Sequence, residues 1–151
     1  AETTGANRNS TKALTSDRRV TTVMNLMPDI RSQPHWSGAS VQHGDSGALI
    51  VTPPQAWQYS AEIRIPSIVS AMNEPHLRVC LRVESGRLGL SVLLGGTEQM
   101  AGEQLISRSP HPVTVTVELP REGATTVMLR NTVETASRAL VLEASLCDRA
   151  D

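Results

Sequence analysis

Two aromatic side chains of this 151-residue chain, Trp57 and Tyr59, are candidates for contact with a ligand. One residue separates them, so an extended strand would place both on the same face, where they could stack on a sugar ring. Ile63 and Ile65 continue that alternation, and this favours the alternative that both aromatics are core residues with their polar tips at the sheet edge.

Charged side chains alternate with apolar ones between residues 77 and 84. Arg78, Arg82 and Glu84 share the polar side of this segment, and the forked donors of arginine suit hydroxyl groups and anions. The alternative is a solvated face with weak ion pairs. We treat these three residues as candidate ligand-binding residues.

The segment Gly44-Asp45-Ser46-Gly47 resembles the sequence around the nucleophilic serine of chymotrypsin-like proteases. Only a short stretch with His35 and His43 precedes it, which leaves no room for the N-terminal barrel of those proteases. Gly, Asp and Ser are common turn residues, so a turn is the preferred interpretation. Hydrolysis through Ser46 is the only concrete enzymatic alternative.

Neither a metal centre nor a cofactor site is predicted. The four histidines have no zinc-site spacing to one another or to a cysteine, although Asp45 and Glu143 are weak candidates for calcium ligands. Cys80 and Cys147 are too few for a disulfide framework. Free thiols are expected, with a disulfide as the alternative if their strands pair.

Short alternating segments from Ser46 to Cys147, bounded by Gly, Pro or Asn, predict an all-β protein. Leu77 to Val83 is the clearest strand, and Ser85-Gly86 before the next strand predicts a hairpin. The predicted strands are residues 48–51, 57–65, 77–84, 88–94, 113–119, 127–130 and 140–146.

Strands with one polar and one apolar face bury the apolar sides between two sheets, so we expect a two-sheet antiparallel β-sandwich, jelly-roll-like, with a closed barrel as the alternative. Residues 1–22 are predicted to be a flexible tail and residues 23–151 a single domain. The apolar run Val23 to Met27, before Pro28, is expected to be a short helix, an edge strand or a docking arm.

The chain has 14 basic and 15 acidic residues, a net charge of −1, and no Phe. This balance and the scarcity of aromatic residues predict no nucleic-acid partner. No apolar run approaches the about 20 residues of a membrane helix, so no membrane insertion is expected. No signal peptide is recognisable; we expect a processed product or a segment of a longer protein, and the localisation stays unknown with the cytoplasm favoured.

Three stretches resemble a carbohydrate-binding-like β-sandwich accessory domain associated with FkbM-type methyltransferases and glycosyltransferases of bacterial surface glycans. They are residues 54–61, residues 81–94, and residues 129–131 with 137–142. The resemblance matches Arg130 and Asn131 to an Arg-Asn pair, which implies a role in ligand binding or in holding an adjacent loop. The chain departs from the family in lacking a Phe after Gly86, and it has no glycine-rich nucleotide loop.

The leading hypothesis is therefore a non-catalytic, carbohydrate-binding-like module that associates a glycan-modifying enzyme with its saccharide. The alternative is a protein–protein interaction or oligomerisation domain that binds no sugar. Trp57, Tyr59, Arg78, Arg82, Glu84, Arg130 and Asn131 are the candidate ligand-binding residues. The predicted partners are a saccharide, a parent or partner enzyme, and a second copy of the chain.

Overall fold

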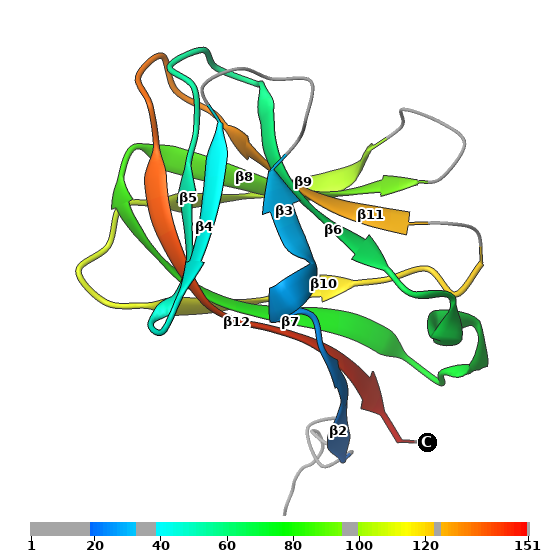
Figure 1. The fold of residues 1–151 in the computed structure, drawn as a ribbon. Coiled ribbons are helices and arrows are strands. Elements are labelled where there is room, and N and C mark those ends of the chain that lie inside the picture. Colours follow the sequence, from blue (N-terminus) through cyan, green and yellow to red (C-terminus); the bar gives the residue numbers. More distant parts are fainter. Residues whose placement is uncertain (1–18, 33–38, 95–99, 123–124, 151) are drawn as a thin grey trace, which may run out of the picture.

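The computed structural model describes residues 19–32, 39–94, 100–122 and 125–150, which form two antiparallel sheets (Figure 1). The six-stranded sheet has the order β10-β7-β12-β5-β4, and β2 also pairs with β12. The other sheet has five strands in the order β3-β6-β11-β8-β9. The strands of the first sheet are β2 (Val20–Asn25), β4 (Ser40–Gly44), β5 (Gly47–Val51), β7 (Pro75–Ser85), β10 (Val113–Glu118) and β12 (Arg138–Arg149). Those of the second are β3 (Ile30–Ser32), β6 (Tyr59–Ile65), β8 (Arg87–Leu94), β9 (Met100–Ser107) and β11 (Thr125–Asn131).

The core lies between the two sheets and is aliphatic. Alternate residues of β7, from Leu77 to Val83, are fully buried, and they belong to the same cluster as Leu88 and Leu90 of β8 and Leu129 of β11. Period-two alternation thus buries one face of β7, as a sandwich requires. The predicted all-β sandwich is confirmed, and among the described residues no helix is long and apolar enough to cross a membrane.

Three strands were not among the predicted segments: β3, β4 and β9. The Val23 to Met27 segment, for which three forms were considered, is divided between the edge strand β2 and the short 3-10 helix η2 (Met27–Asp29). A second 3-10 helix, η3 (Ser67–Ala71), follows β6. Residues 20–22, assigned above to the tail, are part of β2.

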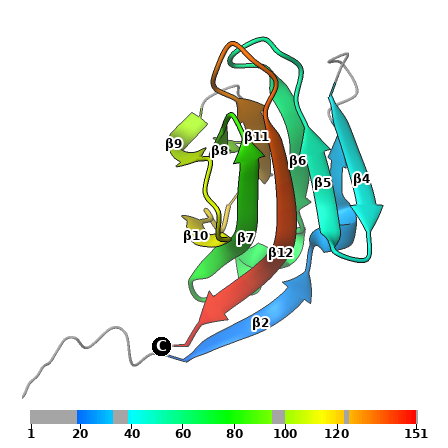
Figure 2. The same cartoon turned by 90° about the vertical axis from the view of Figure 1, so that its left-hand side faces the viewer.

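The predicted hairpin of β7 and β8 is wrong. β7 pairs with β10 and β12, whereas β8 pairs with β9 and β11, so the two strands lie in different sheets (Figure 2). Gly86 makes the crossing with a φ of 79°, a conformation that favours glycine. A Cβ at Gly86 would also collide with Ser137, so the chain turns from one sheet to the other where only glycine fits.

Replacing Gly86 with Ala should lower the free energy of unfolding by about 2 kcal/mol or more, because the positive φ and the collision with Ser137 add together. Urea unfolding measures this loss. Gly102→Ala is the matched control, since Gly102 has a φ of 87° but an added methyl group there would meet no atom within 4 Å. Equal losses in the two variants would contradict the role given to the collision.

Candidate functional site

A β-bulge in β6 brings Tyr59 to the outer face of the five-stranded sheet. Ala61 lies opposite Leu129 of β11, but Tyr59 lies opposite Arg130, so Ser60 is an extra residue in β6. Leu129 is buried in the core, and the alternation of β11 therefore directs Arg130 outward. Tyr59 consequently does not share the core face of Ala61 and Ile63, and the predicted continuous alternation from residue 57 to residue 65 is wrong.

Trp57 precedes β6 and is held with its ring half exposed. Its φ is 71°, the only positive φ outside glycine in the described residues, and 52% of its surface is accessible. A large residue in this conformation is uncommon and needs a structure that enforces it. The backbone N–H of Trp57 donates to the carbonyl of Asn131 at 2.6 Å. The core interpretation of Trp57 is therefore wrong.

Arg130 contacts both aromatic rings. Its guanidinium carbon lies 4.8 Å from the ring centre of Trp57 and 5.6 Å from that of Tyr59, which are cation–π distances. The same guanidinium donates to both carboxylate oxygens of Glu103, at 2.7 and 2.8 Å. These hydrogen bonds raise the pKa of Arg130 above its ordinary value. Rings and charged pair thus form one preorganised unit, the aromatic–arginine cluster of Trp57, Tyr59, Glu103 and Arg130.

Asn131 is completely buried and cannot contact a ligand directly. Its side-chain nitrogen lies within hydrogen-bond distance of the carbonyls of Pro53 and Gln55, at 3.0 and 3.2 Å, and its side-chain oxygen accepts from Ser137 at 2.6 Å. Pro53 and Gln55 belong to the segment that leads to Trp57. Of the two roles considered for Asn131, the geometry supports the second, in which it holds the adjacent loop.

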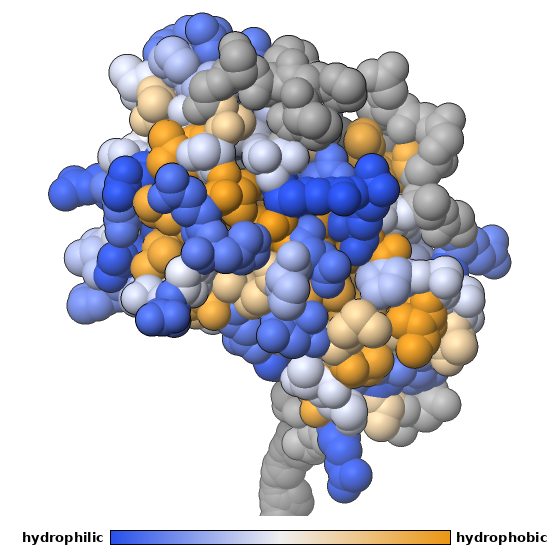
Figure 3. Space-filling model, viewed as in Figure 1, coloured by the Kyte–Doolittle hydropathy of each residue, from blue (hydrophilic) through white to orange (hydrophobic). Residues whose placement is uncertain are grey.

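Further charged groups lie on the same outer face. Glu62 is 7% exposed and accepts from Arg31 of β3 and Arg64 of β6, at 3.2 and 3.1 Å. Strongly hydrophilic side chains are seen over β3 and β6 in the space-filling view (Figure 3). Arg31 and Arg64 keep much of their surface exposed, with 51% and 72% of their side chains accessible. This face therefore offers exposed hydrogen-bond donors in addition to the aromatic–arginine cluster.

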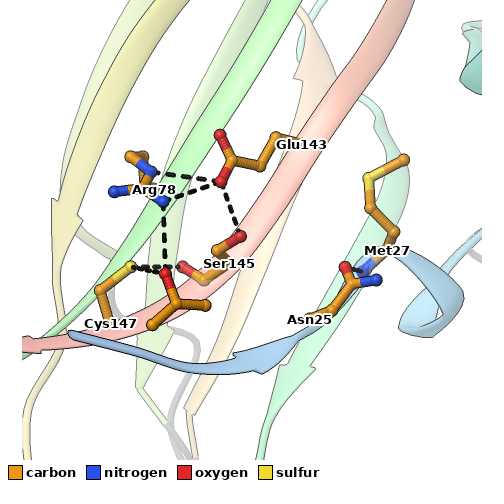
Figure 4. Close-up of polar contacts among 7 residues, drawn as sticks. Asn25, Met27, Arg78, Glu143, Ser145 and Cys147 are labelled. Atoms are coloured by element: carbon orange, nitrogen blue, oxygen red, sulfur yellow. Dashed lines mark hydrogen bonds and ion pairs between the residues drawn. The ribbon is translucent and has the colours of Figure 1, made fainter.

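Arg78 lies on the other sheet, in a network that fastens β2. It donates to Glu143 of β12 at 2.9 Å and to the hydroxyl of Thr22 at 3.4 Å, while Ser145 donates to Glu143 at 2.8 Å (Figure 4). The sulfur of Cys147 lies 4.0 Å from the same Thr22 hydroxyl. Arg78 is thus paired with a carboxylate, as in the solvated-face interpretation.

Arg82 and Glu84 are also on the six-stranded sheet. Arg82 donates to one oxygen of Glu84 at 3.0 Å, and Arg138 of β12 donates to the other at 3.0 Å. The seven candidate residues therefore separate: Trp57, Tyr59 and Arg130 meet on one sheet, Arg78, Arg82 and Glu84 lie on the other, and Asn131 is buried.

Acid should destabilise the fold through Glu143 and Asp148. Hydrogen bonds from Arg78 and Ser145 lower the pKa of Glu143. Burial raises the pKa of Asp148, but hydrogen bonds from the backbone N–H groups of Asn73 and Glu74 bring it below its ordinary value. A carboxyl whose folded pKa is depressed stabilises the fold above its unfolded pKa and loses that contribution as the pH falls through the folded value.

We therefore expect the urea midpoint to be steady from pH 7 to pH 5 and to fall below the ordinary pKa range of carboxyl groups, about pH 4, because the unfolded state then binds protons that the folded state does not. The fall should be smaller in Glu143→Gln than in the unsubstituted chain. An unchanged pH dependence in that variant would contradict the contribution of Glu143.

The remaining predicted features have structural roles. Asp45 and Ser46 form the turn between β4 and β5, as predicted, and the ring of His43 is hydrogen-bonded to the carbonyl of Ile30 at 2.8 Å. Cys80 and Cys147 are free thiols, lying opposite Glu143 and His76 in strand register, too far apart for a disulfide. Within the described residues no group of three or more His, Cys, Asp or Glu side chains could hold a metal ion.

Sequence reasoning missed Glu103, the carboxylate partner of Arg130. It lies in β9, whose sequence lacks the alternation of a half-buried strand. Glu103 and Arg130 are 27 positions apart and give no local signal, because the two meet only through the pairing of β9, β8 and β11. Correlated changes at the two positions among related sequences are the signal that could have found the pair.

The fold is similar to that of solved family 29 carbohydrate-binding modules. One variant of the module CBM29-2 has 15% sequence identity and a TM-score of 0.57, with 87% of this chain and 91% of that chain covered. A variant complexed with cellulohexaose has 13% identity and a TM-score of 0.56, covering 87% and 91%. A third, complexed with mannohexaose, has 14% identity and a TM-score of 0.55, covering 87% and 92%. No protein-family model and no curated protein matches the sequence, so the likeness establishes the fold alone.

Proposed function

We propose that this chain is a non-catalytic module that binds a saccharide on the outer face of its five-stranded sheet. The observation that carries the proposal is Trp57, which a positive φ and a hydrogen bond to Asn131 hold half exposed beside Arg130 and Glu103. An exposed, rigid indole ring can stack on the C–H face of a sugar, and the charged pair beside it can contact hydroxyl groups.

The similar structures support this assignment because some of them hold hexasaccharides. The finer proposal is that the module keeps a glycan-modifying enzyme, in the same chain or as a partner, close to its saccharide. One weak site then acts by raising the effective concentration of substrate near the enzyme.

Calorimetric titration with cellulohexaose and mannohexaose, followed by amide NMR, tests the saccharide site. We expect saturable binding with shifts concentrated at residues 57–62, 102–105 and 128–131. The absence of saturable shifts with these sugars and with bacterial surface polysaccharides at millimolar concentration would argue against the proposal.

A second candidate function is self-association through β2. All six residues of β2 are exposed, its described pairing is to β12 alone, and it extends from the body of the sandwich with the end of β12 (Figure 2). The strand carries no charged residue, Pro or Gly to protect its free edge. The β2 strands of two copies could therefore pair antiparallel, which would join the six-stranded sheet of one copy to that of the other.

Light scattering tests self-association, with a mass near twice the 16.3 kDa of the chain expected for a dimer. Val23→Lys places a charge on the edge strand and should return the protein to the monomer mass. A monomer at every concentration of the unsubstituted chain would exclude this second function.

A further inference from the structure

A hollow on the outer side of the six-stranded sheet is lined by Arg82 and Glu84 of β7 and by Arg108, Ser109 and Pro110 of the segment between β9 and β10. Its volume is about 500 Å³. The aromatic–arginine cluster lies on the other sheet, so the hollow is a separate surface and its role does not depend on the proposed saccharide site.

Positive charge exceeds negative charge around this hollow. Glu84 is shared between Arg82 and Arg138, each at 3.0 Å. Arg108 lines the same hollow and has no ion pair or hydrogen bond to any other residue that the structure describes. Three guanidinium groups therefore accompany one carboxylate, which leaves two positive charges without a matching negative charge.

Two other charged clusters among the described residues are balanced. Arg78 and Glu143 pair one to one, and Arg130 and Glu103 do the same. Glu62 receives two arginines, Arg31 and Arg64. Glu84 likewise receives two arginines, and Arg108 adds a third guanidinium group at the hollow. A charge excess with many N–H donors is the condition for binding an anion.

The guanidinium groups of Arg82 and Arg138 are held in place before any ligand arrives. Arg82 and Arg138 extend from neighbouring strands, and Glu84 fixes one nitrogen of each guanidinium. The segment with Arg108 is anchored by the backbone N–H of Ser109, which donates to the carbonyl of Val83 at 3.2 Å. Nevertheless 39% and 52% of the Arg82 and Arg138 side chains are exposed, so their remaining donors are accessible. Preorganised and accessible donors reduce the entropy lost on binding.

We propose that this hollow binds the phosphate or sulfate ester group of a ligand through Arg82 and Arg108, with Arg138 adding its positive charge from beside Glu84. Guanidinium groups match the oxygens of such esters with paired hydrogen bonds, and two excess positive charges suit a group of one or two negative charges. Glu84 orients two of the arginines and competes with the ligand for their donors.

Amide and arginine side-chain NMR during titration with methyl phosphate and methyl sulfate tests the proposal, with methanol as the neutral probe. These probes carry no sugar ring, so their binding is independent of the saccharide site. We expect saturable shifts at residues 82–84, 107–110 and 138 that weaken with added NaCl. Tighter binding of methyl phosphate would identify a phosphate ester as the ligand group, and equal binding would extend it to sulfate esters.

Two substitutions should change the affinity in opposite directions. Arg108→Gln removes a cation that lines the hollow and should weaken binding about tenfold. Glu84→Gln removes the competing carboxylate and should tighten binding several-fold. Arg121→Gln, near the opposite end of β10, is the charge-matched control and should leave the affinity unchanged.

The proposal would be overturned by equal affinities in Arg108→Gln and the unsubstituted chain, or by shifts that do not saturate. Shifts spread evenly over all arginines would also overturn it, because they would indicate nonspecific screening. Retained dispersion of the amide spectrum in each variant shows that the fold is intact.

Discussion

Replacing Trp57 with Ala should weaken hexasaccharide binding about 30-fold, which corresponds to about 2 kcal/mol, while leaving the sandwich folded. Trp57 supplies the largest exposed ring of the aromatic–arginine cluster, and its removal leaves Tyr59, which is only partly exposed. Stability should change little, because the ring is half exposed and replacement by a small residue removes few core contacts. Calorimetric titration measures the affinity, and urea unfolding measures the stability.

Ile68→Ala is the matched control for the loss of an exposed apolar side chain, since Ile68 lies in η3 and is also exposed. It should bind as the unsubstituted chain does. Arg130→Lys should give an intermediate loss, because lysine keeps the charge but cannot form the paired hydrogen bonds to Glu103. Unimpaired binding by Trp57→Ala would place the saccharide site elsewhere.

Replacing Asn131 with Ala should lower the free energy of unfolding by about 3 kcal/mol. The Asn131 side chain is fully buried, and its loss leaves the Ser137 hydroxyl and the carbonyls of Pro53 and Gln55 without this partner. The loop that leads to Trp57 should also loosen, so saccharide affinity should fall together with stability. Urea unfolding and calorimetry on the same variant measure both effects.

The conservative change Asn131→Asp tests whether the amide N–H donors of Asn131 stabilise the fold or whether its side chain only fills space. An ionised carboxylate would face carbonyl oxygens in place of the amide donor, so this variant should be at least as unstable as Asn131→Ala. Asn25→Ala is the control, since its side chain is exposed and accepts one hydrogen bond, from the Met27 backbone. An Asn131→Ala variant as stable as Asn25→Ala would contradict the loop-holding role.

The parts of the fold that could be predicted are strands that bury one face. In β7 and β10, apolar and polar residues alternate because one side of each strand faces the core, and the sequence shows that period directly. β2 could not be assigned in this way because both of its faces are exposed. β3 has only three residues, too few to show a period.

The wrong hairpin prediction at Gly86 shows that local sequence does not determine which strands pair. A Gly between two alternating segments marks a reversal of the chain, but the same signal fits a turn within one sheet and a crossing between two. The outcome at Gly86 depends on Ser137 and on the distant strands that pair with β7 and β8. The prediction of the site was limited in the same way. Its aromatic and arginine residues could be named from the sequence, but the bulge at Ser60, which brings Tyr59 opposite Arg130, depends on the register between β6 and β11.

The position of β12 bears on how the protein can fold during synthesis. β12 is the last strand of the described chain, yet it lies in the interior of the six-stranded sheet, where it pairs with β7 on one side and with β5 and β2 on the other. Until these residues leave the ribosome, β7 with β10 and β4 with β5 are separate pairs with no strand to join them. The apolar faces of these strands therefore stay without their full set of sheet partners, and open to aggregation, until β12 has been translated.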